Sequence, residues 1–144
     1  MSVPLLEVEG LRTHFFTKAG VVRAVDDVSF TLDRGEVLGL VGESGSGKSI
    51  TGYSIMGLVD PPGRIVEGSI RLDGSELTTL DAESMRKLRG NRVAMIFQDP
   101  MMTLNPVLRI DRQMTEAILA HANVGEAAAR VRARAALVAV GIPS

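Results

Sequence analysis

The feature that most constrains the fold of this chain is one glycine-rich stretch near its first third. It reads, in order, Gly42, Glu43, Ser44, Gly45, Ser46, Gly47, Lys48 and Ser49. This order fits the pattern G-x-x-x-x-G-K-[ST] of a phosphate-binding loop. Only backbone rich in glycine curls tightly enough to aim successive N–H groups at one anion. The sequence therefore predicts a phosphate site built from residues 42–49.

The side chains at the end of the loop favour a nucleotide with a metal ion. Lys48 would place a positive charge at the β- and γ-phosphates, and the Ser49 hydroxyl would take one coordination position on Mg²⁺. Ile50 begins an expected helix over residues 50–58, whose N-terminus would point its partial positive charge at the phosphates. Residues 37–41, ahead of the loop, are almost wholly apolar, which predicts a parallel strand buried on both faces.

Composition narrows the class of protein. The chain has 144 residues and 45% of them are hydrophobic, which is enough for one domain with a core and excludes a disordered chain. A formal net charge of −1 gives no electrostatic reason to expect nucleic-acid binding. Because cysteine is absent, disulfides and thiolate metal sites are excluded. No apolar run reaches the roughly twenty residues of a membrane span.

Three segments show the alternation of half-buried strands. Residues 6–15 alternate, with a shift at Gly10 that predicts a β-bulge, and residues 27–32 alternate cleanly before a turn. Ile70 and Leu72 alternate with polar neighbours and suggest one more strand, which ends at Asp73-Gly74. We expect these strands to be antiparallel and to frame a parallel core.

A second apolar run, residues 93–97, predicts another strand in the interior of the sheet. Gln98 and Asp99 follow it, and ligands of open α/β sheets bind at the carboxyl ends of strands. Gln98 would then lie near the γ-phosphate and Mg²⁺. The alternative is that Gln98 is simply the first polar residue after a strand, and its position alone does not decide between the two.

Helical spacing appears in three places. Asp81 predicts the cap of a short helix, and residues 107–121 and 125–140 predict two longer ones, the last closed by Gly141. We expect two parts: residues 1–97, with the antiparallel strands and the core around the loop, and residues 98–144, with the beginning of a helical subdomain.

These stretches together resemble the ATP-binding subunit of an ABC transporter, in the oligopeptide/dipeptide importer branch. The resemblance rests on LGLVGESGSGKS at residues 38–49, on VAMIFQDPMMTLNP at residues 93–106, and on the spacing of AVDDVSF before the loop. It implies an α/β fold, a P-loop NTPase core with an antiparallel β subdomain and the start of a helical subdomain.

The resemblance also implies roles for single residues. Residues 42–49 match the Walker A loop, which binds ATP with Mg²⁺. Gln98 matches the Q-loop glutamine, which senses Mg²⁺ and the attacking water. Phe15 matches the aromatic residue that stacks on adenine, and stacking tolerates sequence variation because every base has a π face. A purely hydrophobic role for Phe15 stays open, as does an exchange of roles with Phe16.

The family's biology implies a peripheral ATPase subunit on the cytoplasmic face of a bacterial cell membrane that powers import of peptides or a similar small solute. Its partners would be transmembrane permease subunits, a second ATP-binding subunit and, indirectly, an extracytoplasmic solute-binding protein, with no nucleic acid. A soluble ABC ATPase of DNA repair or translation and a non-catalytic nucleotide-binding module are the alternatives. The transported solute is not encoded in this subunit.

The sequence departs from the family's pattern in one respect. It carries no LSGGQ-like signature, no Walker B Asp-Glu pair and no switch histidine, so we expect a piece cut within the helical subdomain that binds ATP without hydrolysing it. An alternative is that residues 95–99 form a Walker B strand with Asp99 on Mg²⁺, but the intervening Gln98 and the Pro-Met-Met-Thr-Leu-Asn-Pro that follows favour the Q-loop.

Overall fold

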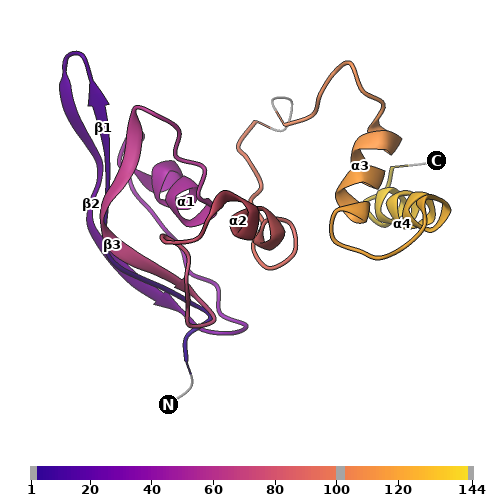
Figure 1. Cartoon of the computed structure of the whole chain (residues 1–144), viewed down its shortest axis with the longest axis horizontal. Coiled ribbons are helices and arrows are strands. Elements are labelled where there is room, and N and C mark those ends of the chain that lie inside the picture. Colours follow the sequence, from indigo (N-terminus) through magenta and orange to yellow (C-terminus); the bar gives the residue numbers. More distant parts are fainter. Residues whose placement is uncertain (1–2, 100–102, 143–144) are drawn as a thin grey trace. The chain divides into compact units, whose positions relative to one another are not determined.

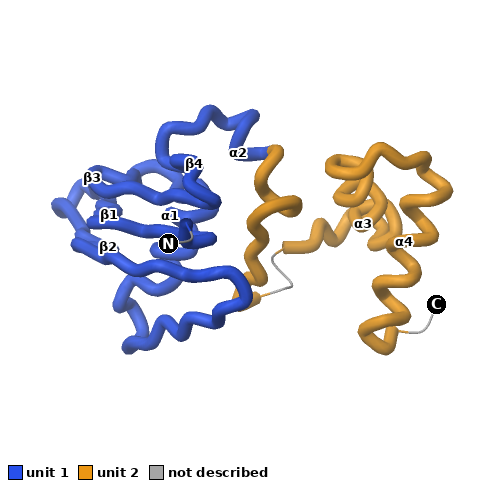
Figure 2. Tube along the Cα trace, turned by 90° about the horizontal axis from the view of Figure 1, so that it is seen from below, with its two compact units in different colours: residues 1–86 blue, residues 87–144 orange. Residues whose placement is uncertain are grey.

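The computed structural model describes residues 3–99 and 103–142, which divide into two compact units. The first unit is Met1–Arg86 and the second is Lys87–Ser144 (Figure 2). The division that the sequence suggests, between residues 97 and 98, falls inside the second unit.

The first unit is built on a four-stranded antiparallel sheet. Its strands are β1 (Leu6–Thr17), β2 (Gly20–Leu32), β3 (Gly63–Leu72) and β4 (Ser75–Glu76), in the spatial order β2-β1-β3-β4. β1 and β2 form a hairpin through the turn at residues 18–19, and β3 pairs with the other edge of β1. The three long antiparallel strands are confirmed, whereas the short β4 has too few residues to show an alternation in the sequence.

The bulge expected at Gly10 is confirmed. The register of β1 shifts between Val8 and Leu11 against β2, and between Glu9 and Arg12 against β3. Gly10 has φ +56°, which is the left-handed region that glycine adopts without cost. Gly68 of β3 has φ +99° and lies so close that a Cβ on it would be 2.6 Å from the Gly10 carbonyl oxygen. The backbone of β3 at Gly68 therefore packs closely against the bulge of β1 at Gly10.

Helix α1 (Lys48–Met56) packs on one face of this sheet (Figure 1). The strand positions that alternate toward it form the core, because every second side chain of a strand points to the same face. The buried apolar side chains of the first unit are Val8, Leu11, Val25, Met56, Ile70, Leu72, Leu77 and Met85. The helix begins two residues before the expected start at residue 50 and ends at Gly57, whose φ is +61°.

The two expected parallel strands are not formed, and this part of the prediction was wrong. Residues 37–41 belong to no strand, with Val37 95% exposed and Val41 91% exposed. Within residues 93–97 the structure has only one bridge, from Val93 to Arg89, and Ile96 is 98% exposed. An apolar run predicts that a segment is buried, but it does not predict which element buries it. A strand forms only where another strand supplies backbone hydrogen bonds. In the parts of the chain that the structure describes, residues 37–41 pair with no strand, and residues 93–97 make only the single bridge to Arg89.

Helix α2 (Ala82–Leu88) spans the division between the units. The expected cap is confirmed, because the Ser84 backbone N–H donates to Asp81 Oδ1 at 2.7 Å. Met85 is the buried residue of this helix.

The second unit contains helices α3 (Ile110–Leu119) and α4 (Glu126–Ala139), which pack against each other. Both lie inside the ranges predicted from helical spacing, and Gly141 follows α4 with φ +79° as expected of a closing glycine. Ala129 and Ala133 are the buried residues of α4, and their small side chains let α3 approach closely. Within residues 3–99 and 103–142, no helix is both long and apolar enough to cross a membrane.

Candidate functional site

The phosphate-binding loop leads directly into α1. Gly47, with φ +91°, is the residue before the helix, and its carbonyl accepts the Thr51 backbone N–H at 2.8 Å and the Thr51 hydroxyl at 3.0 Å. The first turn of α1 contains no acidic residue, and no side chain caps it. Its N–H groups and its partial positive charge are therefore available to an anion at the loop.

The Lys48 ammonium closes the loop on itself. Its Nζ donates to the Gly42 carbonyl at 2.7 Å, to the Glu43 carbonyl at 2.6 Å and to Ser46 Oγ at 3.2 Å. An ammonium has three protons, so these bonds use its whole donor capacity. A phosphate that binds Lys48 must therefore replace at least one bond within the loop. The positive charge already stands at the centre of the loop, where the sequence predicts it.

Close contacts surround two of the loop glycines, and at Gly47 they require glycine. A Cβ on Gly42 would lie 2.5 Å from Ser46 Oγ. A Cβ on Gly47 would lie 2.2 Å from the Ala24 carbonyl oxygen of β2, and the positive φ of Gly47 excludes ordinary side chains a second time. The end of the loop therefore rests directly on the backbone of β2.

The remaining loop residues are open to solvent. Glu43, Ser44, Gly45 and Ser46 are exposed, as is Ser49, and Ile50 is half-buried. Ser46 N–H donates to the Glu43 carbonyl at 3.2 Å, which forms the tight turn of the loop. A ligand can thus approach the loop from outside.

Phe15 lies on β1 opposite Val22 of β2 and Gly63 of β3. Its ring rests on Gly63, where a Cβ would come within 2.5 Å of Phe15 Cε1 and 2.8 Å of Val59 Cγ1. Phe15 is half-buried, so part of the ring remains accessible. Two residues earlier, Thr13 Oγ1 lies 2.8 Å from Ser54 Oγ of α1. Because strand side chains alternate, Phe15 shares the face that α1 covers.

Phe16 belongs to the opposite face of the sheet. Its ring centroid lies 6.4 Å from that of His14, and the Arg64 guanidinium carbon stands 4.4 Å over the ring. Of the two aromatic residues left open by the sequence, Phe15 is thus the one on the side of the loop.

The distance from Phe15 to the loop follows from the strand register. Gly47 touches Ala24, and Ala24 is two residues along β2 from Val22, the partner of Phe15. With a rise of about 3.3 Å per residue and about 4.8 Å between strands, the backbone of Phe15 lies about 8 Å from the point of contact. In the first unit, the strand that carries Phe15 therefore pairs with the strand on which the end of the phosphate-binding loop rests.

Gln98 and Asp99 are exposed residues of the second unit, and they are not placed relative to the loop. Among the described residues, no group of three or more histidine, aspartate or glutamate side chains gathers in a way that could hold a metal ion. The predicted Mg²⁺ ligands Ser49 and Gln98 are both neutral oxygen donors, a chemistry that suits Mg²⁺ only alongside phosphate oxygens and water.

Sequence reasoning overlooked two features near Phe15. One is the contact of its ring with Gly63, and the other is the pair of buried hydroxyls of Thr13 and Ser54, which are 0% and 2% exposed. The sequence did contain an indication of the hydroxyl pair. Thr13 lies on the same strand face as Leu11 and Phe15, and a hydroxyl on a buried face needs a hydrogen-bond partner. The partner itself, 41 residues away, leaves no trace in the local pattern.

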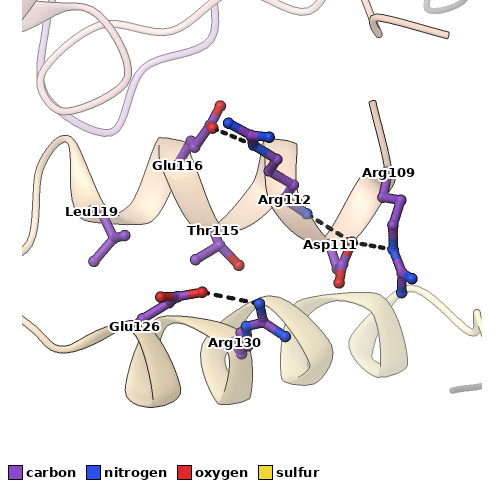
Figure 3. A pocket seen from close by; sticks show the side chains of 8 residues that line it. All are labelled: Arg109, Asp111, Arg112, Thr115, Glu116, Leu119, Glu126 and Arg130. Atoms are coloured by element: carbon purple, nitrogen blue, oxygen red, sulfur yellow. Dashed lines mark hydrogen bonds and ion pairs between the residues drawn. The ribbon is translucent and has the colours of Figure 1, made fainter. Parts of the chain in front are cut away.

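A hollow lies between α3 and α4, and Figure 3 shows its lining. Its charged side chains pair with one another: Arg109 with Asp111, Arg112 with Glu116, and Arg130 with Glu126 (Figure 3). A hydrogen bond from Arg109 lowers the pKa of Asp111, in keeping with this pairing. Since the charges are already matched within the hollow, it offers no excess charge to a ligand.

Comparison with known proteins identifies the family. A family model described as ABC transporter matches residues 25–144, which is most of the chain. The chain belongs to the ABC transporter family. The match begins in β2 and includes the whole phosphate-binding loop.

Among curated relatives of this family, the chain is 51% identical over 138 residues to the oligopeptide transport ATP-binding protein AppD of Bacillus subtilis (strain 168). That alignment covers 95% of the chain and 42% of the relative. It is 45% identical over 139 residues to the dipeptide transport ATP-binding protein DppD of Escherichia coli (strain K12), covering 96% of the chain and 42% of the relative. The chain thus spans less than half the length of these relatives.

Solved structures of ABC transporter cassettes share the fold. The chain superposes on the dimeric structure of MJ0796, a bacterial ABC transporter cassette, with TM-score 0.75 and 22% identity over 88% of the chain and 53% of that structure. The structure of the same cassette described as bound to ADP and Pi gives TM-score 0.77 over 92% of the chain and 56% of that structure, at 22% identity. The α/β P-loop NTPase fold class expected from the sequence is confirmed, although the two inner parallel strands are not formed in this chain.

Proposed function

We propose that this chain is the nucleotide-binding part of an ATP-binding subunit that couples ATP binding and hydrolysis to import of peptides, or a similar small solute, through an ABC transporter. One observation carries the proposal: the Lys48 ammonium stands at the centre of a loop whose end opens into the uncapped N-terminus of α1. That arrangement collects positive charge and N–H donors in one small exposed place, as a chain of phosphates requires.

The base would bind at Phe15, on the same side of the sheet as the loop. Base–aromatic stacking is worth about 1–3 kcal/mol, and the half-buried ring, supported by Gly63 and Val59, offers one face for it. The phosphates would extend from there to residues 42–49, about 8 Å away by the strand spacings. Phe15 and the loop together favour a nucleotide over a simple phosphate.

Mg²⁺ would be held by the Ser49 hydroxyl, phosphate oxygens and water, with the Gln98 amide oxygen as a further ligand from the second unit. An ion there would neutralise part of the charge on the β- and γ-phosphates. Ser49 is exposed at the first turn of α1, immediately after Lys48, so its hydroxyl is accessible from the loop. We assign the catalytic roles, which would act in the complete subunit, to Lys48, by neutralising phosphate charge, and to Gln98, by sensing Mg²⁺ and the attacking water.

The proposed partners are transmembrane permease subunits and a second ATP-binding subunit, at the cytoplasmic face of a bacterial cell membrane, with an extracytoplasmic solute-binding protein acting indirectly. The names of the relatives, which are transport ATP-binding proteins for oligopeptides and dipeptides in bacteria, support the permease partners. The dimeric cassette structures support the second subunit. Co-purification of the corresponding full-length protein with permease subunits tests this assembly. Its recovery as a soluble protein without them would refute the transport role.

Calorimetric titration of the 144-residue chain with Mg-ATP tests the binding site. Charge-assisted hydrogen bonds from Lys48 are worth roughly 1.5–3 kcal/mol, so Lys48→Ala should weaken ATP binding about ten- to a hundredfold. Lys18→Ala is the matched control, because Lys18 is an exposed lysine in the turn between β1 and β2. Unchanged affinity in folded Lys48→Ala would refute the placement of the phosphates.

We expect the chain to bind Mg-ATP without turning it over. Phosphoryl transfer depends on positioning and on neutralisation of charge, and the loop supplies only the phosphate cradle and one metal ligand. Phosphate release under excess Mg-ATP should equal the background rate. Release at an ordinary enzymatic rate that Lys48→Ala abolishes would contradict this expectation and would return Asp99 as the metal-binding carboxylate.

A further inference from the structure

We propose that Thr13 is a positioning residue that holds the Phe15 ring in register with the phosphate-binding loop, through two hydroxyl hydrogen bonds that link β1 to α1. This inference rests on the proposed function, since it concerns how the two halves of a nucleotide site are kept at a fixed distance. It assigns a role in binding to two residues, Thr13 and Ser54, that touch no ligand.

The direction of the two bonds follows from the number of protons. Ser54 Oγ donates to the Ile50 carbonyl at 2.8 Å, and a serine hydroxyl has one proton. In the 2.8 Å contact between Thr13 Oγ1 and Ser54 Oγ, the Thr13 hydroxyl must therefore be the donor. The bonds run in one sense, from Thr13 to Ser54 to the backbone of Ile50, and both side chains are buried.

The two ends of this link are the two ends of the proposed site. Thr13 precedes Phe15 by two residues on β1, so the strand carries any displacement of one to the other. Ile50 is the third residue of α1 and follows Ser49 of the loop directly. A strand and a helix are stiff elements, and the hydroxyl link joins them at fixed positions. The link therefore holds β1, which carries the Phe15 ring, at a fixed position relative to α1, which follows the phosphate-binding loop.

The second contact between loop and sheet does not fix this register by itself. Gly47 rests on the Ala24 carbonyl of β2, and β2 shifts register against β1 between Leu11 and Thr13 and again between Thr13 and His14. At a β-bulge one residue is left unpaired and the ladder is locally disrupted, so the pairing of β1 with β2 is irregular on both sides of Thr13. The link from Thr13 crosses directly from β1 to α1 and does not pass through β2.

Thr13→Val is the variant that separates positioning from general damage to the fold. Valine has the shape of threonine without the hydroxyl, and Ser54 keeps its own bond to the Ile50 carbonyl, so no buried proton is left without an acceptor. Ser54→Ala, in contrast, leaves the Thr13 proton unpaired. Thr13→Ser keeps the donor and loses only a methyl group, which makes it the matched control.

The readout is the ratio of the affinities for ATP and for inorganic triphosphate, measured on the whole 144-residue chain by calorimetry in the presence of Mg²⁺. Thr13→Val should weaken ATP binding about two- to tenfold, because partial loss of a stacking contact corresponds to that range. Triphosphate, which has no base, should bind as it does to the unmodified chain. Thr13→Ser should keep the original ratio, and Ser54→Ala added to Thr13→Val should cause no further change in it.

The outcomes separate the inference from the proposed function. Equal losses for ATP and triphosphate, or an unchanged ratio in Thr13→Val, would overturn the positioning role and leave the hydroxyl pair as a packing feature. If Thr13→Val does not fold, Ser54→Ala is read by the same ratio and the same criteria. Failure of the unmodified chain to bind either ligand would instead refute the nucleotide site, and the positioning role with it.

Discussion

Gly63→Ala provides a sharp test of the aromatic platform, because the structure shows how far the ring must move. A Cβ at this position would stand 2.5 Å from Phe15 Cε1, 2.9 Å from Phe15 Cδ1 and 2.8 Å from Val59 Cγ1. The φ of Gly63 lies outside the positive range that strains an L-residue, so the backbone accepts alanine without cost. The substitution therefore acts through the side chain of Phe15 and its neighbour Val59.

The magnitude follows from ordinary contact distances. Carbon atoms in contact lie about 3.5–4.0 Å apart, so the ring must retreat by about 1 Å, and a gap of that size forfeits a quarter to a half of the attraction between two surfaces. Applied to a stack worth about 1–3 kcal/mol, the loss is about 0.3–1.5 kcal/mol, or roughly two- to tenfold in the ATP dissociation constant. Binding of inorganic triphosphate should not change.

Competition titrations with ATP and triphosphate measure this effect, with thermal unfolding as a check on the fold. Gly125→Ala is the control, because a Cβ there meets no atom within 4 Å and the residue lies in the second unit. An ATP affinity that stays unchanged in folded Gly63→Ala would show that the base does not use the Phe15 ring. Equal weakening of both ligands would show that the substitution disturbs the loop as well.

Two further predictions concern the stability of the first unit and its loop. Gly47→Ala should abolish phosphate binding and lower the melting temperature, because its Cβ would lie 2.2 Å from the Ala24 carbonyl oxygen and its φ is +91°; a stable variant that binds triphosphate normally would contradict the observed docking of the loop on β2. The second prediction concerns Glu76. Burial alone would raise the pKa of its carboxyl group, but hydrogen bonds from Ser69 and Thr78 lower this pKa from 4.5 to about 2. A lowered pKa stabilises the fold above the unfolded value and loses that contribution as pH falls, here between about pH 5 and pH 2. The full shift corresponds to at most about 3 kcal/mol, and solvent screening reduces the expected loss to about 1–2 kcal/mol. Urea unfolding at pH 6 and pH 3 measures the free energy of unfolding. Between these pH values it should fall in the unmodified chain by about 1–2 kcal/mol more than in Glu76→Gln. An equal fall in both would exclude Glu76 as the cause.

Local pattern predicted the antiparallel strands, the bulge at Gly10 and the cap at Asp81, because each of these depends on residues close together in the chain. A strand face shows in every second residue, and a cap shows in the residue that precedes the helix. The phosphate-binding loop belongs to the same class, since its shape is set by its own glycines and by the helix that follows it. These features carry their cause within a few residues of sequence.

The features that the sequence did not predict depend on partners far away in the chain. The contact of Gly63 with Phe15 spans 48 residues and exists only because β3 pairs with β1 in one register. The same holds for Thr13 and Ser54. The apolar runs at residues 37–41 and 93–97 were interpreted as strands from hydrophobicity alone, and hydrophobicity does not supply the backbone partner that a strand needs.

The hydrogen bonds of Lys48 within the loop compete with any anion that binds there. Lys48 already donates hydrogen bonds to two carbonyls and to the Ser46 hydroxyl. An incoming anion must therefore offer oxygens that bind the ammonium more strongly than these partners do. A lone sulfate or orthophosphate would bring little beyond that exchange, whereas a chain of phosphates is long enough to contact Lys48 and the N–H groups of α1 together. This exchange would favour a polyphosphate over single anions, before any contact with the base contributes to selectivity.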